Sequence, residues 1–162
     1  MKYAGIKEND IVDGEGVCVS FWTQGCPHRC KGCHNPETWD FNGGIEEKDT
    51  ELLNKIIKLI NKNGVNRNLS ILGGEPLCDE NRKFVATLIG AAKQAYPHLE
   101  VFLWTGYTIE EILSKKDIDK DINFIYENSD VIIEGPYIEE LRDISLKLRG
   151  SLNQRIIRKQ KE

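Results

Sequence analysis

Apolar residues recur along this chain in two alternating patterns, one typical of buried strands and the other typical of amphipathic helices. Short, nearly continuous apolar runs predict four strands, at residues 17–23, 69–72, 101–104 and 131–134. The segments between them carry apolar residues three and four positions apart, as on one face of a helix. The chain therefore alternates strand and helix through most of its length.

Start and stop signals support three helices between these strands. The first is predicted over residues 49–63, where the apolar residues fall on one face. Asp79 is the expected N-cap of the second helix, which ends before Pro97. Thr108 and Glu111 have the spacing of a capping box at the start of the third helix.

This alternation predicts an α/β fold in which neighbouring strands are parallel and the crossovers are right-handed. The 162 residues suffice for one domain, whereas a closed (β/α)8 barrel needs about 250 residues. We therefore expect a partial, open parallel β/α barrel. A single domain is predicted over residues 1–155, and residues 156–162, four of which are charged, are predicted to fray as a C-terminal tail.

Four motifs come directly after the predicted strands, around Cys26, Gly73, Thr105 and Gly135. The carboxyl ends of parallel strands lie at one edge of a sheet, and α/β folds bind their ligands at that edge. The sequence therefore predicts that these motifs gather on one rim.

Composition excludes several classes of partner. The formal net charge is −4, so no basic surface for nucleic acid is expected. The apolar runs are too short to span a membrane, and the N-terminus lacks the pattern of a signal peptide. Five cysteines without a signal peptide indicate a reducing compartment. We expect a cytoplasmic protein with no membrane or nucleic-acid partner.

The most specific motif is a C-x3-C-x2-C run formed by Cys26, Cys30 and Cys33. Three thiolates this close cannot all pair as disulfides, but they can bind one metal centre. A structural zinc site has four protein ligands, and a cubane iron–sulfur cluster usually has four cysteines. Three cysteines would leave one iron of such a cluster open to a substrate. A zinc knuckle completed by His28 or His34 is the alternative.

A second motif, Gly73-Gly74-Glu75-Pro76, follows the strand at residues 69–72. Glycines at the carboxyl end of a strand let the backbone approach a ligand closely. The two cysteines outside the run, Cys18 and Cys78, are predicted to be small buried apolar residues.

Together, the cysteine run and the Gly-Gly-Glu-Pro motif resemble the radical S-adenosylmethionine superfamily. Three further segments resemble its glycyl-radical-enzyme activases, specifically the family that activates anaerobic ribonucleoside-triphosphate reductase. They are Asp-Gly-Glu-Gly at 13–16, Trp-Thr-Gly-Tyr at 104–107 and Arg-Gly-Ser-x-Asn-Gln-Arg at 149–155. The likeness runs from about residue 3 to residue 155. Two positions depart from the activase pattern, since Glu15 replaces a proline and Cys18 replaces an arginine.

The resemblance implies a partial barrel of the radical S-adenosylmethionine type that binds one [4Fe-4S] cluster. The implied cluster ligands are Cys26, Cys30 and Cys33, and no separate acid or base residue is expected. S-adenosylmethionine would chelate the open iron and contact two short segments. These contacts are Gly32, Cys33, His34, Gly73, Gly74 and Glu75.

The implied activity is reductive cleavage of S-adenosylmethionine to a 5′-deoxyadenosyl radical, which removes a hydrogen atom from a glycine of the reductase. The family implies a flavodoxin-type electron donor, and either a homodimer or a heterotetramer with the reductase. Two other functions stay open. One is a small-molecule radical enzyme similar to 7-carboxy-7-deazaguanine synthase, and the other is a zinc-binding interaction module. A short, open barrel suits a polypeptide substrate better than an enclosed small molecule.

Overall fold

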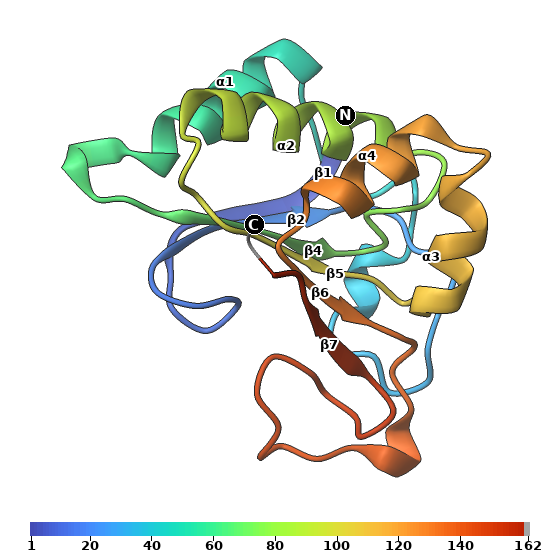
Figure 1. Cartoon of the computed structure of the whole chain (residues 1–162). Coiled ribbons are helices and arrows are strands. Elements are labelled where there is room, and N and C mark those ends of the chain that lie inside the picture. Colours follow the sequence, from blue (N-terminus) through green and yellow to red (C-terminus); the bar gives the residue numbers. More distant parts are fainter. Residues whose placement is uncertain (161–162) are drawn as a thin grey trace.

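One open, mixed sheet of seven strands runs through the described residues, 1–160, of the computed structural model (Figure 1). The strand order across the sheet is β3-β1-β2-β4-β5-β6-β7. Its centre consists of four parallel strands, which correspond to the four predicted from the apolar runs. They are β2 (Cys18–Thr23), β4 (Asn68–Gly73), β5 (Val101–Trp104) and β6 (Val131–Glu134). The α/β prediction is confirmed.

Three antiparallel strands, which the sequence did not predict, make the sheet mixed rather than wholly parallel. β1 (Lys2–Asp10) pairs with β2, and the short β3 (Ile45–Glu46) pairs with β1. At the other edge, β7 (Arg155–Arg158) pairs with β6. The expectation of a frayed tail is therefore wrong for residues 156–158, because their backbone completes the ladder of β6. Residues 161 and 162 lie outside the described residues.

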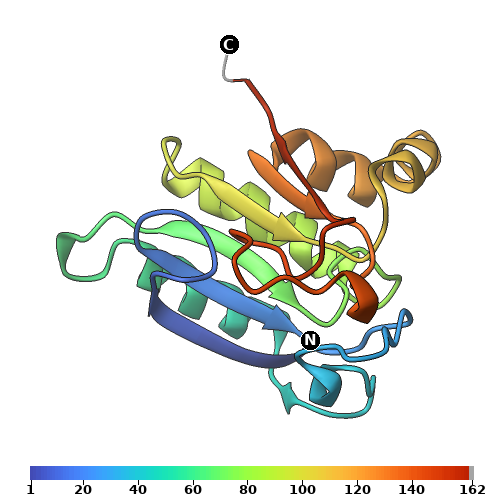
Figure 2. The same ribbon diagram turned by 90° about the horizontal axis from the view of Figure 1, so that it is seen from below.

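Four helices cover one face of the sheet and leave the other face to loops (Figures 1 and 2). They are α1 (Asp49–Ile60), α2 (Arg82–Ala95), α3 (Ile109–Lys116) and α4 (Lys120–Asn128). Three short 3-10 turns lie at Pro36–Thr38, Lys62–Gly64 and Glu139–Leu141. Figure 2 shows the blue loop before β2 and the red segment before β7 on the face that carries no helices. On this uncovered face, loops rather than helices lie over the sheet.

The helix ends depart from the predictions in two places and agree in one. The first helix stops at Ile60 rather than at residue 63, because the backbone already leaves the helical region at Asn61, with φ of −119°. The second begins at Arg82, and Asp79, instead of capping it, forms an ion pair with Arg82. The capping box of Thr108 with Glu111 is confirmed. Helix α4 was not predicted.

The main core lies between the sheet and the helical layer, and a smaller apolar cluster lies on the uncovered face. Strand β5 shows how one strand serves both. Val101 and Leu103 join the main core, whereas Phe102 joins the smaller cluster, to which Trp104 packs. The period-two alternation of a strand sends these side chains to opposite faces. The smaller cluster also receives Leu148, so it anchors the segment before β7 beneath the strand ends.

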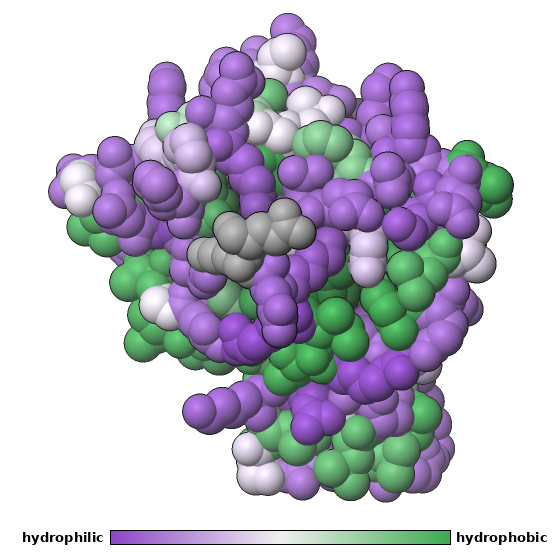
Figure 3. Space-filling model, in the orientation of Figure 1, coloured by the Kyte–Doolittle hydropathy of each residue, from purple (hydrophilic) through white to green (hydrophobic). Residues whose placement is uncertain are grey.

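The surface is mixed in character. In the view of Figure 3, hydrophilic residues cover most of the helical layer, and hydrophobic residues gather mainly below it. Among the described residues, no helix has both the length and the apolar composition needed to cross a membrane.

Candidate functional site

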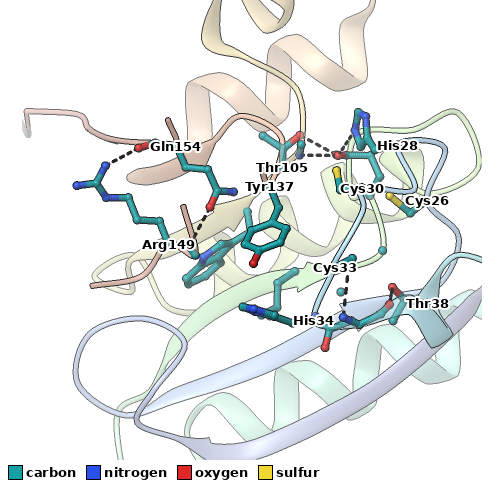
Figure 4. Close-up of a pocket in the computed structure, with 18 of the residues that line it drawn as sticks. Cys26, His28, Cys30, Cys33, His34, Thr38, Thr105, Tyr137, Arg149 and Gln154 are labelled. Atoms are coloured by element: carbon teal, nitrogen blue, oxygen red, sulfur yellow. Dashed lines mark hydrogen bonds and ion pairs between the residues drawn. The ribbon is translucent and has the colours of Figure 1, made fainter. Parts of the chain in front are cut away.

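A cavity of about 360 Å³ lies at the carboxyl ends of the four parallel strands (Figure 4). Each of these strands contributes residues that follow its end. The segment after β2 supplies Cys26, and the turn after β4 supplies Gly74. Thr105 follows β5, and Gly135 follows β6. The prediction that these motifs gather on one rim is confirmed.

All three cysteines of the C-x3-C-x2-C run line this cavity as free thiols. The loop begins at a fixed point, because the Gly25 N–H donates to the Thr38 carbonyl at 2.7 Å. It turns back on itself where the Cys33 N–H donates to the Cys30 carbonyl at 3.1 Å. Burial raises the pKa of the Cys26 thiol. The folded loop therefore places all three cysteines along one cavity.

The other two cysteines do not line the cavity. Cys18 is fully buried in β2, and Cys78 is 4% exposed. Burial, reinforced by the nearby Glu75 charge, raises the pKa of the Cys78 thiol to about 12. Both cysteines have the buried location predicted for them.

The two glycines at the end of β4, Gly73 and Gly74, are required by close backbone packing. Gly73 has φ of +101°, and a Cβ there would lie 2.7 Å from the Thr23 nitrogen. A Cβ on Gly74 would lie 2.4 Å from the Gly25 carbonyl oxygen. Both residues line the cavity. The strand end thus packs directly against the start of the cysteine loop, a contact that the sequence pattern did not predict.

Glu75 is fully buried, and its carboxylate accepts four hydrogen bonds. One oxygen accepts from the Leu77 N–H at 2.9 Å and from the Thr105 hydroxyl at 2.7 Å. The other accepts from the Gly106 N–H at 2.8 Å and lies 2.7 Å from Nε2 of His28. Two of these partners, His28 on the cysteine loop and Thr105 after β5, are labelled in Figure 4.

His28 is held on several sides. Burial lowers the pKa of its imidazole, but the hydrogen bond and the charge of Glu75 outweigh burial, and the net shift is upward. The ring meets Tyr107 edge-on with centroids 4.6 Å apart. It also leaves no room for a side chain at Gly106, where a Cβ would lie 2.5 Å from the ring.

The other two predicted contact residues of the cysteine loop behave differently from each other. His34 lines the cavity, and its ring packs against Tyr137 with centroids 5.1 Å apart. Gly32 lies outside the cavity lining, and a Cβ there would collide with the Glu139 carboxylate. The cysteine loop therefore contacts the segment before β7 at two points.

The Arg-Gly-Ser-x-Asn-Gln-Arg segment closes one side of the cavity. Oε1 of Gln154 accepts from the Gly150 N–H at 2.9 Å, and its amide donates to the Gly135 carbonyl at 3.0 Å. The Arg149 guanidinium donates to the Gln154 carbonyl at 2.6 Å. The indole N–H of Trp104 donates to the Leu148 carbonyl at 2.6 Å. These bonds fix the segment across the strand ends (Figure 4).

Two carboxyl groups lie close together where β1 ends and the segment before β2 begins, Asp10 in the strand and Asp13 in the segment. Burial and the neighbouring Asp10 raise the pKa of Asp13, which lines the cavity, to about 6. Burial alone would raise the pKa of Asp10 too. Hydrogen bonds from the Val12 N–H at 2.9 Å and the Ser20 hydroxyl at 2.7 Å instead lower it to about 2. A proton in this pair therefore resides on Asp13.

Comparison with known proteins identifies the family. The family model described as a 4Fe-4S single cluster domain matches residues 12–157. The chain is 33% identical over 159 residues to the anaerobic ribonucleoside-triphosphate reductase-activating protein of Haemophilus influenzae. The aligned region covers 98% of each of the two chains. The identity of this chain to the protein of the same name is 34% in Vibrio cholerae, again covering 98% of each chain. It is also 34% in enterobacteria phage T4, covering 96% of this chain and 93% of the phage protein.

The chain belongs to the family of anaerobic ribonucleoside-triphosphate reductase-activating proteins. The resemblance stated from the sequence is thereby confirmed, and the 4Fe-4S description of the matching domain agrees with the three free thiols around the cavity.

The residues around the cavity can be compared with the 4Fe-4S cluster that the family model describes. Within residues 1–160, no three His, Cys, Asp or Glu side chains converge on a point where one metal ion could be held. Three cysteines line the shared cavity, and cysteine thiolates are the usual ligands of an iron–sulfur cluster. Glycine backbone lines the same space and leaves room beside the thiols.

The sequence indicated His28 as a candidate zinc ligand but gave no sign of its contact with Glu75. The two residues are 47 positions apart, and no local pattern links them. The histidine two positions after the first cysteine was the available signal. The role of this histidine became clear only in the folded structure, where the ring lies beside Glu75 in the turn after β4.

Proposed function

We propose that this chain activates an anaerobic ribonucleoside-triphosphate reductase by generating a glycyl radical on it. The observation that carries the proposal is the cavity itself. It combines three free thiols with a glycine-lined strand end. The chain around it matches the reductase-activating proteins over nearly its whole length.

The proposed cofactors are one [4Fe-4S] cluster and S-adenosylmethionine. The cluster would be held by Cys26, Cys30 and Cys33, with one iron left without a protein ligand. The presence of all three cysteines in the lining of one cavity supports this ligand set. S-adenosylmethionine would lie against two segments. They are Gly32 to His34 and Gly73 to Glu75.

The proposed architecture is the partial barrel of radical S-adenosylmethionine enzymes, acting as one domain. Its parallel part would be β2, β4, β5 and β6, whose carboxyl ends border the cavity. Residues 1–155 would form the domain. The last strand, β7, begins at Arg155 and continues to Arg158. The helices on a single face agree with the outer layer of such a barrel.

Bound in this cavity, the cluster and S-adenosylmethionine would supply reductive cleavage of the sulfonium and removal of a hydrogen atom from a glycine. The protein's own part is to bind, orient and shield. Thr105 and Gly106 fix Glu75, which orders the turn after β4. The segment at 149–155 covers one side against water. Hydrogen-atom transfer needs no acid or base, so none is assigned.

The uncovered face of the sheet suits a polypeptide substrate. Two segments flank the cavity there, and both expose apolar side chains. Val12, in the segment before β2, is 68% exposed, and Ile144, in the segment before β7, is 89% exposed. A protein loop carrying the target glycine could enter between them. Backbone glycine is a suitable target because no side chain blocks access to its α-carbon.

The remaining partners follow from the family. We propose a flavodoxin-type electron donor, a cytoplasmic location, and either a homodimer or a heterotetramer with the reductase. Neither nucleic acid nor membrane is proposed as a partner, in keeping with the net charge of −4.

The decisive experiment is electron paramagnetic resonance (EPR) on a reconstituted mixture. The protein is reconstituted with iron and sulfide without oxygen, reduced, loaded with S-adenosylmethionine and mixed with the reductase. A doublet should appear on the reductase and should be lost when its target glycine is changed to alanine. A reductase that stays radical-free while a small molecule is consumed would support the small-molecule enzyme instead.

A further inference from the structure

The His28–Glu75 contact joins the cysteine loop to the turn after β4. Nε2 of His28 lies 2.7 Å from a carboxylate that is fully buried, and the imidazole itself is 19% exposed. Within residues 1–160, no other side chain from residues 27–33 makes a hydrogen bond outside that loop. His28 therefore joins the middle of the loop to the turn after β4, whereas the Asn81 amide, which donates to the Gly25 carbonyl at 3.4 Å and to the Glu75 carbonyl at 3.0 Å, joins only the start of the loop to that turn.

The Glu75 carboxylate has no free acceptor site. A carboxylate offers about four lone-pair sites. Here they face His28 and three donors of the protein's own turns, from Leu77, Thr105 and Gly106. A ligand ammonium group would have to displace one of these donors. The side chain of Glu75 is therefore arranged to hold protein segments together.

Tyr107 and Gly106 complete the support of the imidazole. Tyr107 contacts the ring edge-on, and the absence of a side chain at Gly106 lets the ring approach the backbone. The two residues belong to the segment after β5, so three strand ends share one small network. A shift of the His28 ring would alter the cysteine loop and both neighbouring turns together.

We propose that His28 is a positioning residue for the cofactor site. Through Glu75 it fixes the part of the loop between Cys26 and Cys30 relative to the turn after β4. The residues that would hold the cluster and those that would bind S-adenosylmethionine thereby keep a fixed position relative to one another. This inference rests on the proposed cofactor site. It does not depend on which substrate receives the radical.

The test compares two substitutions of His28 with a matched control. His28→Ala removes the donor, whereas His28→Gln keeps an amide donor near the position of Nε2. Lys93→Ala is the control, because Lys93 also makes a half-buried ion pair, with Asp130 at 2.9 Å. That pair lies just before β6, at the opposite end of the sheet from the cavity.

Each reconstituted variant is measured for iron content, for the EPR signal of the reduced cluster with and without S-adenosylmethionine, and for the dissociation constant of S-adenosylmethionine. We expect His28→Ala to keep its iron but to bind S-adenosylmethionine about tenfold or more weakly, the equivalent of one charge-assisted hydrogen bond. Its ligand-induced EPR change should be reduced or lost. His28→Gln should restore both, and Lys93→Ala should match the wild type.

A wild-type EPR change and wild-type affinity in His28→Ala would overturn the proposal. Should His28→Ala lose its iron, His28→Gln decides the matter through the same two readouts. A glutamine variant that binds iron and S-adenosylmethionine like the wild type supports the positioning role of His28. One that binds iron but not S-adenosylmethionine contradicts it. A missing glycyl radical on the reductase would leave these measurements intact, so the two proposals can fail separately.

Discussion

Replacing Gly74 with alanine should separate the β4 turn from the cysteine loop. The added Cβ would lie 2.4 Å from the Gly25 carbonyl oxygen and 2.9 Å from the Gly25 carbonyl carbon. A relaxed carbon–oxygen contact is about 3.3 Å or longer. Because the obstacle is backbone rather than a flexible side chain, the two segments must move apart by about 0.9 Å.

That movement acts on the hydrogen bond between the Glu75 N–H and the Gly25 carbonyl, which is 2.8 Å long. Losing one buried backbone hydrogen bond costs about 1–3 kcal/mol. Overpacking a tight site costs a further 1–3 kcal/mol or so. We therefore expect Gly74→Ala to lower the free energy of unfolding by roughly 2–6 kcal/mol. Gly74→Val, with its β-branched side chain, should cost more and should weaken binding of S-adenosylmethionine.

Denaturant unfolding of the metal-free protein measures the stability, and titration of the reconstituted protein measures the affinity. Gly5→Ala is the control, because a Cβ at Gly5 would meet nothing within 4 Å. The control should unfold within about 0.5 kcal/mol of the wild type. A Gly74→Ala variant with the stability and affinity of the control would show that this backbone contact does not constrain the site.

Three further outcomes are expected. Iron analysis after reconstitution should show loss of the cluster on alanine substitution of any proposed ligand and full retention in Cys78→Ala, whereas iron loss in Cys78→Ala would revise the ligand set. The proposed ligands are Cys26, Cys30 and Cys33. The folded protein holds the Asp13 proton up to about pH 6, against an ordinary pKa of 3.8, so wild-type stability should fall as pH rises from about 4 to about 6. Unfolding at several pH values should show Asp13→Asn gaining stability relative to the wild type over that window, and a constant difference would contradict the assignment. Ile144→Asp should lower the radical yield on the reductase about tenfold at limiting partner, as the loss of one apolar contact predicts, and leave the S-adenosylmethionine-induced EPR change intact. An unchanged yield would place the docking surface elsewhere.

Local sequence patterns determined the central elements of the fold. The apolar runs specified β2, β4, β5 and β6, since a buried parallel strand is apolar along its length. The motifs after them had to meet at one rim, because parallel strands present their carboxyl ends at the same edge. The cysteine spacing and the glycine pair indicated the chemistry, and the family comparison agrees with that interpretation.

Pairing between distant segments was beyond the reach of these patterns. β1 is interrupted by polar residues, and its burial alternates irregularly, so no strand pattern stands out. β7 joins the sheet because β6 would otherwise leave an open edge of unpaired backbone groups. Its charged residues, Arg155 and Arg158, are exposed, and the two isoleucines between them are partly buried. The four charged residues among residues 156–162 indicated a frayed tail, so the strand was not predicted.

The site shows the same division. Sequence alone determined which residue types lie on the rim, because their positions after strands are set by local periodicity. Only the tertiary structure decided what each of them contacts. Glu75 meets His28 across 47 positions, and Gly32 meets Glu139 across more than twice that separation. Such contacts arise because chain crossovers bring strand ends together, and hydrogen-bond partners across crossovers leave no periodic trace in the sequence.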